Sequence, residues 1–376
     1  MATIRFPSPG LNPERLAALM NARQLDALLL TSPENVYYTT GYPAIPSAGN
    51  PILYALRNVL PFYAFLDRNG KATLLCWGGA AVGVEFDAES TITFPDAASA
   101  ARRLSELLGE RAKSTPRIGI ESSCPYDAYQ LLLQSFGAER IALADDVLRD
   151  ARLVKSPLEA AYLRKSTAIV EKTVSELIDL LHLGISRPEL IYEAKARMLR
   201  NGATGIGHVT ISFGSSNPEV EIDEKLEAGK LVVLDLGALY QGYASDNRRL
   251  LYTGEVPAGM SQLHATMCSI VDEVAANMQP GSTFDDLYQL AIQLYARNQL
   301  NPFIPNVGHT IGLNTEEAWL YRDSPVVVQP GMVINLELYS LYPTGELIGD
   351  EETYWIDQHG AQRLTNLPRE IKPVLS

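Results

Sequence analysis

The first 150 residues alternate between short apolar runs, which are typical of strands, and apolar residues spaced three or four apart, which are typical of helices. A turn at Thr31-Ser-Pro-Glu34 is expected to close the first strand, and Asn69-Gly70 predicts a hairpin between the second strand and the third. We expect strands at 27–30, 61–66, 72–77, 117–120 and 140–143, and helices at 13–23, 97–111 and 126–134. Strands that alternate with helices favour a mostly parallel α/β domain, here over residues 1–150.

A different pattern begins near Lys155. Ser156-Pro-Leu-Glu159 combines a capping serine, a proline suited to the first helical position and a glutamate placed for a capping box, and Ser186-Arg-Pro-Glu189 repeats this signal. Two helices are therefore expected, the second ending near residue 200. Strands at 208–213, 231–240 and 243–251 should follow, then helices at 260–278 and 284–297, and strands at 309–313, 332–339 and 347–356.

Two stretches of this second half correspond residue by residue. Gly207-His208 matches Gly308-His309, and Gly229–Asp235 matches Gly331–Glu337, with histidine-to-carboxylate separations of 27 and 28 residues. Matches in the same register predict a duplicated helix–helix–strand unit. We expect the two copies to form a single curved sheet with helices outside it, as an α+β domain over residues 151–376 with a pseudo-two-fold axis through its concave face.

Composition and charge exclude or disfavour several classes of protein. Hydrophobic residues at 46% and charged residues at 20% exclude a largely disordered chain. The net charge of −13 disfavours a nucleic-acid or anionic-membrane partner, and no apolar run approaches the roughly 20 residues of a membrane span. The three cysteines are far apart, which argues against a disulfide framework or a cysteine zinc site. With no signal-peptide core near the N-terminus, we expect a cytoplasmic protein.

Four acidic residues occupy strand positions that apolar residues normally hold. Asp235 and Glu337 each interrupt an apolar run, and Asp246 and Glu351 follow eleven and fourteen residues later, beyond a tight turn. A carboxylate in a buried strand is costly unless it is paired or bound to a cation. Together with His309, the four acids provide enough hard ligands for two divalent metals that share a bridging water. The alternative is that an arginine or a backbone amide satisfies each acid separately.

These residues lie in segments that resemble the motifs of the M24 family, which includes aminopeptidase P, prolidase, methionine aminopeptidase and creatinase. The matching segments are Asp235–Arg249, Gly308–Leu313, Met332–Glu337 and Glu351–Thr353, with Arg152–Glu159 resembling the start of the family's catalytic half. Asn35–Tyr42 resembles the creatinase/prolidase N-terminal domain. The resemblance implies an N-terminal domain of that type over 1–150 and a "pita-bread" catalytic domain over 151–376.

The resemblance also implies a dinuclear site. Its ligands would be Asp235, Asp246, His309, Glu337 and Glu351, and Glu337 would in addition accept a proton from the bridging water. The metal in this family is commonly manganese, cobalt, zinc or iron, and family members of this length are usually homodimers. Arg249 aligns with a family arginine near the metal-bound carboxylates, although a surface arginine is an equally good interpretation.

The family pattern is broken at two histidines that active peptidases usually carry. One lies seventeen residues before the first metal aspartate and the other seven after the metal histidine, which here are Pro218 and Glu316. Those histidines stabilise the developing oxyanion, a role in which a carboxylate is a poor substitute. Glu316 is a candidate proton donor or anchor for a substrate amine. His208, the counterpart of His309, either faces the site as a catalytic residue or is a satisfied core histidine.

The other histidines, His182, His264 and His359, are expected to be solvated. The leading hypothesis is a metal-dependent hydrolase of a small amide or an Xaa-Pro-like peptide. One alternative is a lyase on the same metal scaffold, similar to the dimethylsulfoniopropionate lyase of the family, acting on a small carboxylate substrate. The other is a binding protein of the same fold, against which the five retained ligands weigh. Each hypothesis implies a small-molecule or short-peptide partner.

Overall fold

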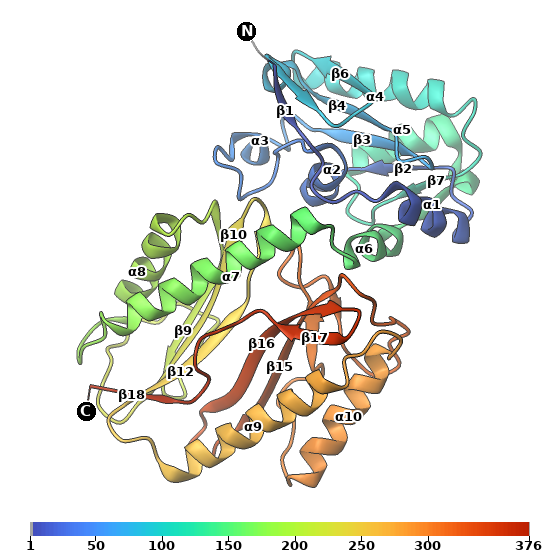
Figure 1. The fold of residues 1–376 in the computed structure, drawn as a ribbon. Coiled ribbons are helices and arrows are strands. Elements are labelled where there is room, and N and C mark those ends of the chain that lie inside the picture. Colours follow the sequence, from blue (N-terminus) through green and yellow to red (C-terminus); the bar gives the residue numbers. More distant parts are fainter. Residues whose placement is uncertain (1–2, 376) are drawn as a thin grey trace. The chain divides into compact units, whose positions relative to one another are not determined.

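The computed structural model describes residues 3–375 and divides the chain into two compact units (Figure 1). The first unit comprises the residues up to Arg152 together with Ser156–Glu159, and the second comprises Leu153–Lys155 and the residues from Ala160 onward. Within residues 3–375, no helix combines the length and the apolar character that crossing a membrane requires.

The first unit is built on a six-stranded sheet. Its strands are β2 (Ala27–Leu30), β3 (Tyr63–Asp67), β4 (Ala72–Trp77), β6 (Ser90–Phe94), β7 (Ile118–Ile120) and β8 (Ile141–Leu143), in the order β6-β4-β3-β2-β7-β8. Three of the five ladders are parallel, as expected for a mostly parallel domain, whereas β3 pairs antiparallel with both neighbours. The expected hairpin joins β3 to β4. Strands β1 (Ile4–Phe6) and β5 (Val84–Phe86) form a separate parallel pair.

Helices cover both faces of this sheet. On one face lie α1 (Pro13–Ala22), α2 (Pro33–Thr40) and α6 (Asp145–Leu153), and on the other α4 (Ala97–Arg111) and α5 (Tyr126–Phe136), while α3 (Ile52–Ala55) is a single turn. The segment expected as a turn at Thr31–Glu34 is instead the start of α2. The reason is that Ser32 accepts a hydrogen bond from the Asn35 amide and Pro33 takes the first helical position. The apolar pattern does not anticipate α6.

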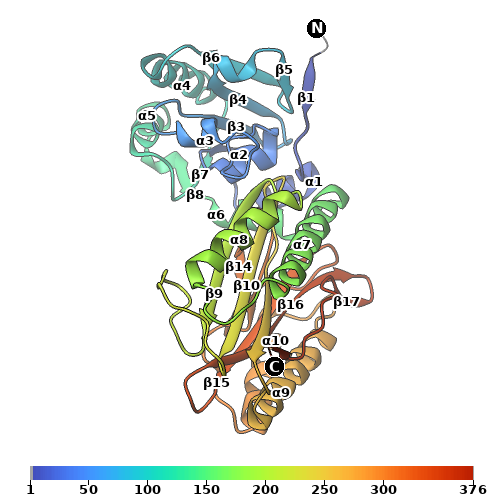
Figure 2. The same ribbon diagram turned by 90° about the vertical axis from the view of Figure 1, so that its left-hand side faces the viewer.

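The second unit contains two five-stranded sheets, and each is built mainly on one copy of the duplicated pattern. The first comprises β9 (Gly205–Phe213), β10 (Leu231–Tyr240), β11 (Tyr243–Ala244), β12 (Asn247–Thr253) and β18 (Lys372–Val374). The second comprises β13 (Gly308–Thr310), β14 (Ala318–Trp319), β15 (Val333–Leu341), β16 (Leu347–Asp357) and β17 (Gly360–Arg363). Four helices cover them. Both α7 (Pro157–Ile178) and α8 (Arg187–Arg200) pack on the first sheet, and α9 (Ala258–Ala276) and α10 (Phe284–Arg297) pack on the second (Figures 1 and 2).

The expectation of one continuous curved sheet is wrong. Strand β12 already pairs with β10 and β18, and β16 with β15 and β17, so both edges of each strand are at least partly used. The two sheets meet instead through side chains that bond to the backbone of the other sheet. The Arg248 guanidinium donates to the Leu347 carbonyl at 3.0 Å, and Thr353 Oγ1 donates to the Asp246 carbonyl at 3.2 Å. These contacts place β12 beside β16, where the candidate site lies.

Candidate metal centre

The strand register gathers the four predicted carboxylates. Asp235 lies in the middle of β10, and Asp246 lies in the two-residue gap between β11 and β12. Glu337 on β15 is directly opposite Glu351 on β16 in an antiparallel ladder. Residues that oppose each other in such a ladder point to the same face of the sheet, so the two glutamates lie side by side. Asp246 and Glu351 are buried, and Asp235 and Glu337 are nearly so.

Two imidazoles, one from each copy of the duplicated unit, contact the aspartates. His208 Nε2 lies 3.1 Å from Asp235 Oδ1 and 3.1 Å from Asp246 Oδ1. His309 Nε2 lies 3.5 Å from the second oxygen of Asp246. Asp246 therefore stands between the two histidines. The structure therefore brings His208 to the predicted ligands Asp235 and Asp246.

The glutamates are held by residues that sequence reasoning did not single out. Asn335 Nδ2 donates to Glu351 Oε1 at 2.8 Å, and Thr353 Oγ1 in turn donates to Asn335 Oδ1 at 2.9 Å. Tyr339 Oη lies 2.8 Å from Glu351 Oε2 and 3.3 Å from Glu337 Oε2. Asn335 and Tyr339 flank Glu337 at a spacing of two along β15, which puts all three on one face. That spacing is the sequence signal that could have found them.

Arg248 supplies a positive charge to the site. It is directly opposite Asp235 in the β10–β12 ladder, and its Nη1 lies 3.6 Å from Asp235 Oδ2. Its guanidinium carbon lies 4.7 Å from the centre of the Tyr339 ring, within the range of a cation–π contact. The neighbouring Arg249 points to the opposite face, where Nη2 pairs with Glu352 at 2.9 Å. Arg249 is buried, so the surface interpretation of this residue is wrong.

Negative charge exceeds positive charge in this cluster, and the pKa values reflect it. Burial, followed by the charges of Asp246 and Asp235, raises the pKa of Glu337 to about 8 and the pKa of Glu351 well above its usual range. Burial also disfavours ionised Asp246, but the adjacent His208 outweighs it and lowers the pKa of Asp246 to about 2. The four carboxylates face one arginine and two imidazoles. They offer mostly oxygen ligand atoms, with two imidazole nitrogens beside them, and such a set of ligand atoms suits a divalent transition metal. The residues present therefore fit a metal ion.

Glu316 lies near this cluster but is exposed. Its carboxylate accepts a hydrogen bond from Trp319 Nε1 at 2.6 Å, and its charge contributes to the raised pKa of Glu337. Trp319 is directly opposite His309 in the β13–β14 ladder, so its side chain points to the same face as the imidazole. Pro218, where the family resemblance leads us to expect the other histidine, lies in the loop between β9 and β10. Its carbonyl accepts a hydrogen bond from the fully buried Arg187 at 2.9 Å.

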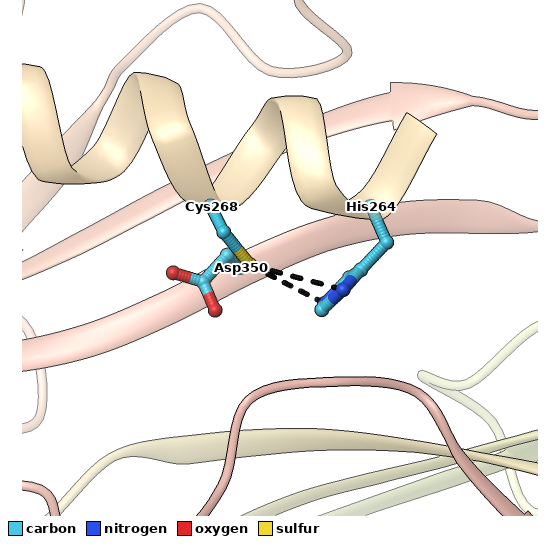
Figure 3. A group of neighbouring side chains, drawn as sticks. All are labelled: His264, Cys268 and Asp350. Carbon is cyan, nitrogen blue, oxygen red and sulfur yellow. Dashed lines mark hydrogen bonds between the residues drawn. The ribbon is translucent and has the colours of Figure 1, made fainter. Parts of the chain in front are cut away.

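A second group of potential ligands lies behind β16. His264 and Cys268 on α9 approach Asp350 on β16, and Cys268 Sγ is 3.7 Å from His264 Nδ1 (Figure 3). The expectation that His264 is solvated is wrong, because the face of α9 that carries it packs against β16 and leaves it 4% exposed. Asp350 accepts hydrogen bonds from Arg369 at 2.5 to 3.2 Å, so an arginine already compensates its charge. This group is therefore accounted for as a buried ion pair.

Comparisons with known proteins cover both units. The model of "Metallopeptidase family M24" matches residues 161–365, and that of the "Creatinase/Prolidase N-terminal domain" matches residues 13–154. An Xaa-Pro dipeptidase from Pyrococcus horikoshii is 28% identical over 365 residues, which covers 95% of this chain and 97% of that protein. An Xaa-Pro dipeptidase from Pyrococcus furiosus is 27% identical over 366 residues, 95% of this chain and 98% of the relative.

Solved structures agree with the fold. The crystal structure of the prolidase from Pyrococcus horikoshii superimposes with a TM-score of 0.78 at 26% identity, covering 96% of this chain and 99% of the other. An X-Pro aminopeptidase from Thermotoga maritima gives a TM-score of 0.79 at 20% identity, over 96% of this chain and 99% of that one, which supports the fold alone. The expected architecture, a creatinase-type N-terminal domain followed by a pita-bread domain, is confirmed.

Proposed function

Since the chain belongs to metallopeptidase family M24, we propose that it is a metal-dependent hydrolase that acts on a small amide or an Xaa-Pro-like peptide. The observation that carries this proposal is the convergence of the four carboxylates with His309 around a region short of positive charge. The curated relatives named above are Xaa-Pro dipeptidases, so a substrate with an imide or amide bond is the first to test. Among residues 3–375, no contact favours either alternative function, an elimination reaction or ligand binding without catalysis.

We assign five residues as ligands of two divalent metal ions, namely Asp235, Asp246, His309, Glu337 and Glu351. Manganese, cobalt, zinc and iron all suit a set of four carboxylates and an imidazole. When bound, such ions polarise a carbonyl and lower the pKa of bound water. The chain's own contribution to the chemistry is Glu337, which takes the proton of the attacking water on a carboxylate oxygen and passes it to the leaving nitrogen. Tyr339 and Asn335 hold Glu351 in place through the hydrogen bonds described above.

We further propose that Glu316 anchors the substrate's amino group. Its carboxylate is exposed, its orientation is fixed by the indole of Trp319, and it lies on the side of the cluster that carries His309. An ammonium group of a peptide would pair with this carboxylate and stack against the exposed ring. The Glu316 carboxylate is a poor hydrogen-bond donor to an oxyanion, which limits how well the site can cleave a standard peptide bond.

The test combines metal content with turnover. Wild type and the variants Asp235→Ala and Glu337→Ala are loaded with manganese, cobalt or zinc, dialysed, and measured by elemental analysis. Each is then assayed against Xaa-Pro dipeptides, other dipeptides and small amides. We expect about two ions per wild-type chain, hydrolysis of at least one of these substrates, and loss of both properties in the two variants with the circular dichroism spectrum unchanged.

Glu273→Ala provides the matched control, because Glu273 is an acidic residue on α9 whose side chain is 46% exposed and pairs with the exposed Arg297. It should retain metal and turnover. Full metal occupancy in both ligand variants would contradict the assigned ligands. A wild-type protein that holds metal but hydrolyses none of these substrates would contradict the proposed reaction.

A further inference from the structure

The side chain of His208 is positioned by the register of β9 on β10. Asp235 is opposite Thr210, and Gly237, two residues further along β10, is opposite His208. Because side chains two residues apart share a face of the sheet, the imidazole lies on the same face as the Asp235 carboxylate. Gly237 makes room for the ring, because a Cβ at this position would lie 2.4 Å from His208 Nδ1. The ring therefore rests over Gly237 and directs Nε2, the nitrogen farther from the backbone, at the two aspartates.

The distances within this group are those of atoms that share one ion. Two ligand atoms that are each about 2.1 Å from a metal lie about 3.0 Å apart at right angles and about 3.4 Å apart in a tetrahedron. His208 Nε2 is 3.1 Å from one oxygen of each aspartate, which falls between these values. The nearest ligand atoms of His208, Asp235 and Asp246 all lie within 4.8 Å of one another. Imidazole nitrogen and carboxylate oxygen together form a common donor set for zinc and related metals.

We propose that His208 is itself a metal ligand, bound through Nε2 to the ion that Asp235 and Asp246 hold. This inference rests on the proposed function, because it adds one ligand to the site assigned there. It gives the first copy of the duplicated unit an imidazole equivalent to His309 in the second copy, so that each half of the site has one nitrogen ligand. It also replaces the sequence-based hypothesis that His208 acts on the substrate, since the nitrogen that would reach a substrate is directed at the carboxylates.

An additional imidazole changes the metal preference of the site. Imidazole favours zinc, iron, nickel and copper, whereas sites made only of carboxylate and water favour magnesium, calcium and manganese. We therefore expect the ion between Asp235 and Asp246 to be held more tightly as zinc or cobalt than as manganese. His208→Gln should reduce the zinc affinity of that position by at least about tenfold, while manganese affinity falls less.

The experiment counts the imidazole ligands directly. In the cobalt(II)-substituted protein, each coordinated histidine contributes one solvent-exchangeable N–H proton with a large hyperfine shift in the proton NMR spectrum. We expect two such signals in wild type, one in His208→Gln and one in His309→Gln. His182→Gln, which removes an exposed histidine, is the control and should keep both signals. Competition between zinc and manganese, followed by elemental analysis, gives the affinity ratio of the same proteins.

The outcomes separate this inference from the proposed function. Wild-type protein that binds cobalt with a single imidazole signal would overturn the role of His208 and leave the metal-dependent function in place. Wild-type protein that binds no metal would overturn both. Because the wild-type spectrum alone counts the ligands, the result does not depend on whether a variant folds. A His208→Gln protein with two imidazole signals and an unchanged ratio of zinc to manganese would likewise overturn the inference.

Discussion

The phenolic oxygen of Tyr339 lies 2.8 Å from Glu351 Oε2 and 3.3 Å from Glu337 Oε2, so one hydroxyl contacts both glutamates. Tyr339 is buried, and the guanidinium of Arg248 stacks on its ring. The phenol therefore fixes the relative positions of two carboxylates that we assign as metal ligands. Hydrogen-bonding partners of this kind orient a ligand and tune its affinity for the ion without touching the ion.

The first prediction concerns Tyr339→Phe. Removing the hydroxyl leaves the ring and its contact with Arg248 but removes the hydrogen bond to Glu351 Oε2, while Asn335 still holds the carboxylate at Oε1. We expect metal affinity to fall by about 10–100-fold with the fold retained. Isothermal titration with manganese and cobalt measures the change. Tyr295→Phe is the control, because Tyr295 also donates through its hydroxyl, to the Tyr339 carbonyl, and not to a carboxylate. Equal affinities in wild type and Tyr339→Phe would show that the phenol does not position the ligand.

The second prediction concerns pH. Burial and neighbouring charge raise the pKa of Glu337 from 4.5 to about 8, and the pKa of Glu351 is also raised. A group whose pKa is raised by folding stabilises the protein fully below its unfolded pKa, and this contribution is lost as pH rises through the folded pKa. The metal-free protein should therefore unfold at a lower temperature at pH 8.5 than at pH 6. Glu337→Gln should reduce this fall, with the remainder due to Glu351 and His208.

Saturating divalent metal is the second arm of this test. A bound cation compensates the ionised carboxylates, so the fall in melting temperature between pH 6 and pH 8.5 should shrink or vanish when metal is added. Thermal unfolding followed by circular dichroism measures both arms. A fall of the same size in wild type and in Glu337→Gln would refute the assignment to this carboxyl.

The third prediction concerns the ion pair behind β16. The side chain of Asp350 is 3% exposed and depends on Arg369, whose side chain is 12% exposed. Arg369→Ala would leave a buried carboxylate without its partner, which typically costs about 3–5 kcal/mol of stability. We expect the melting temperature of the second unit to fall by on the order of 10 °C. Arg297→Ala removes an exposed partner of Glu273 and should change stability by less than about 1 kcal/mol. Similar shifts in both variants would contradict this interpretation.

The sequence predicted the elements whose signals are local. The expected limits of α4 and α10 agree with the structure, because Asp96 and Thr283 cap the helices with their side chains. The duplication also located the acids, since Asp235 and Glu337 stand out in apolar runs. In contrast, Ser32-Pro33 is a signal for a turn and for a helix start alike, and only the packing of α2 on the sheet decides between them.

The remaining errors came from information that is not local. Arg248 joins the site through its cross-strand pairing with Asp235, which the sequence of one strand does not reveal. The division into two sheets depends on how β17 and β18 occupy the edges of their neighbours. The burial of His264 does not follow from the sequence, because α9 is apolar around much of its circumference and the sequence does not show which face packs on β16.

The fourth prediction concerns assembly. The resemblance to the M24 family over both units leads us to expect a homodimer, and a net charge of −13 does not prevent a large apolar interface. Light scattering at micromolar concentration should give about twice the mass of one chain. The mass should persist on dilution and in high salt, because an apolar interface is not screened. A stable monomer under these conditions would refute the expectation.

The last prediction concerns the donors that a peptidase of this family needs. The resemblance to the M24 family leads us to expect that active members carry histidines where this chain has Pro218 and Glu316. Pro218 has no side-chain donor, and its loop is tied back to the buried Arg187. Glu316 is exposed, and its carboxylate accepts a hydrogen bond from Trp319 Nε1 instead of donating one to a substrate. Losing one oxyanion donor typically costs about 10²–10³ in turnover, or about 2.7–4 kcal/mol.

Simple Xaa-Pro dipeptides should therefore be poor substrates even for fully metal-loaded protein. A negative charge beside a forming oxyanion repels it, so the activation barrier for hydrolysis is higher than the missing donors alone would make it. Glu316→His should restore one donor and raise kcat on Xaa-Pro dipeptides by at least about tenfold. Glu316→Gln isolates the charge, because it removes the anion and supplies an amide donor at similar size, so its kcat should lie between wild type and Glu316→His. Turnover of a panel of Xaa-Pro peptides by manganese-, cobalt- and zinc-loaded protein decides the matter. Wild-type rates at the level of ordinary peptidases, unchanged in both variants, would show that the donors lie elsewhere in the chain.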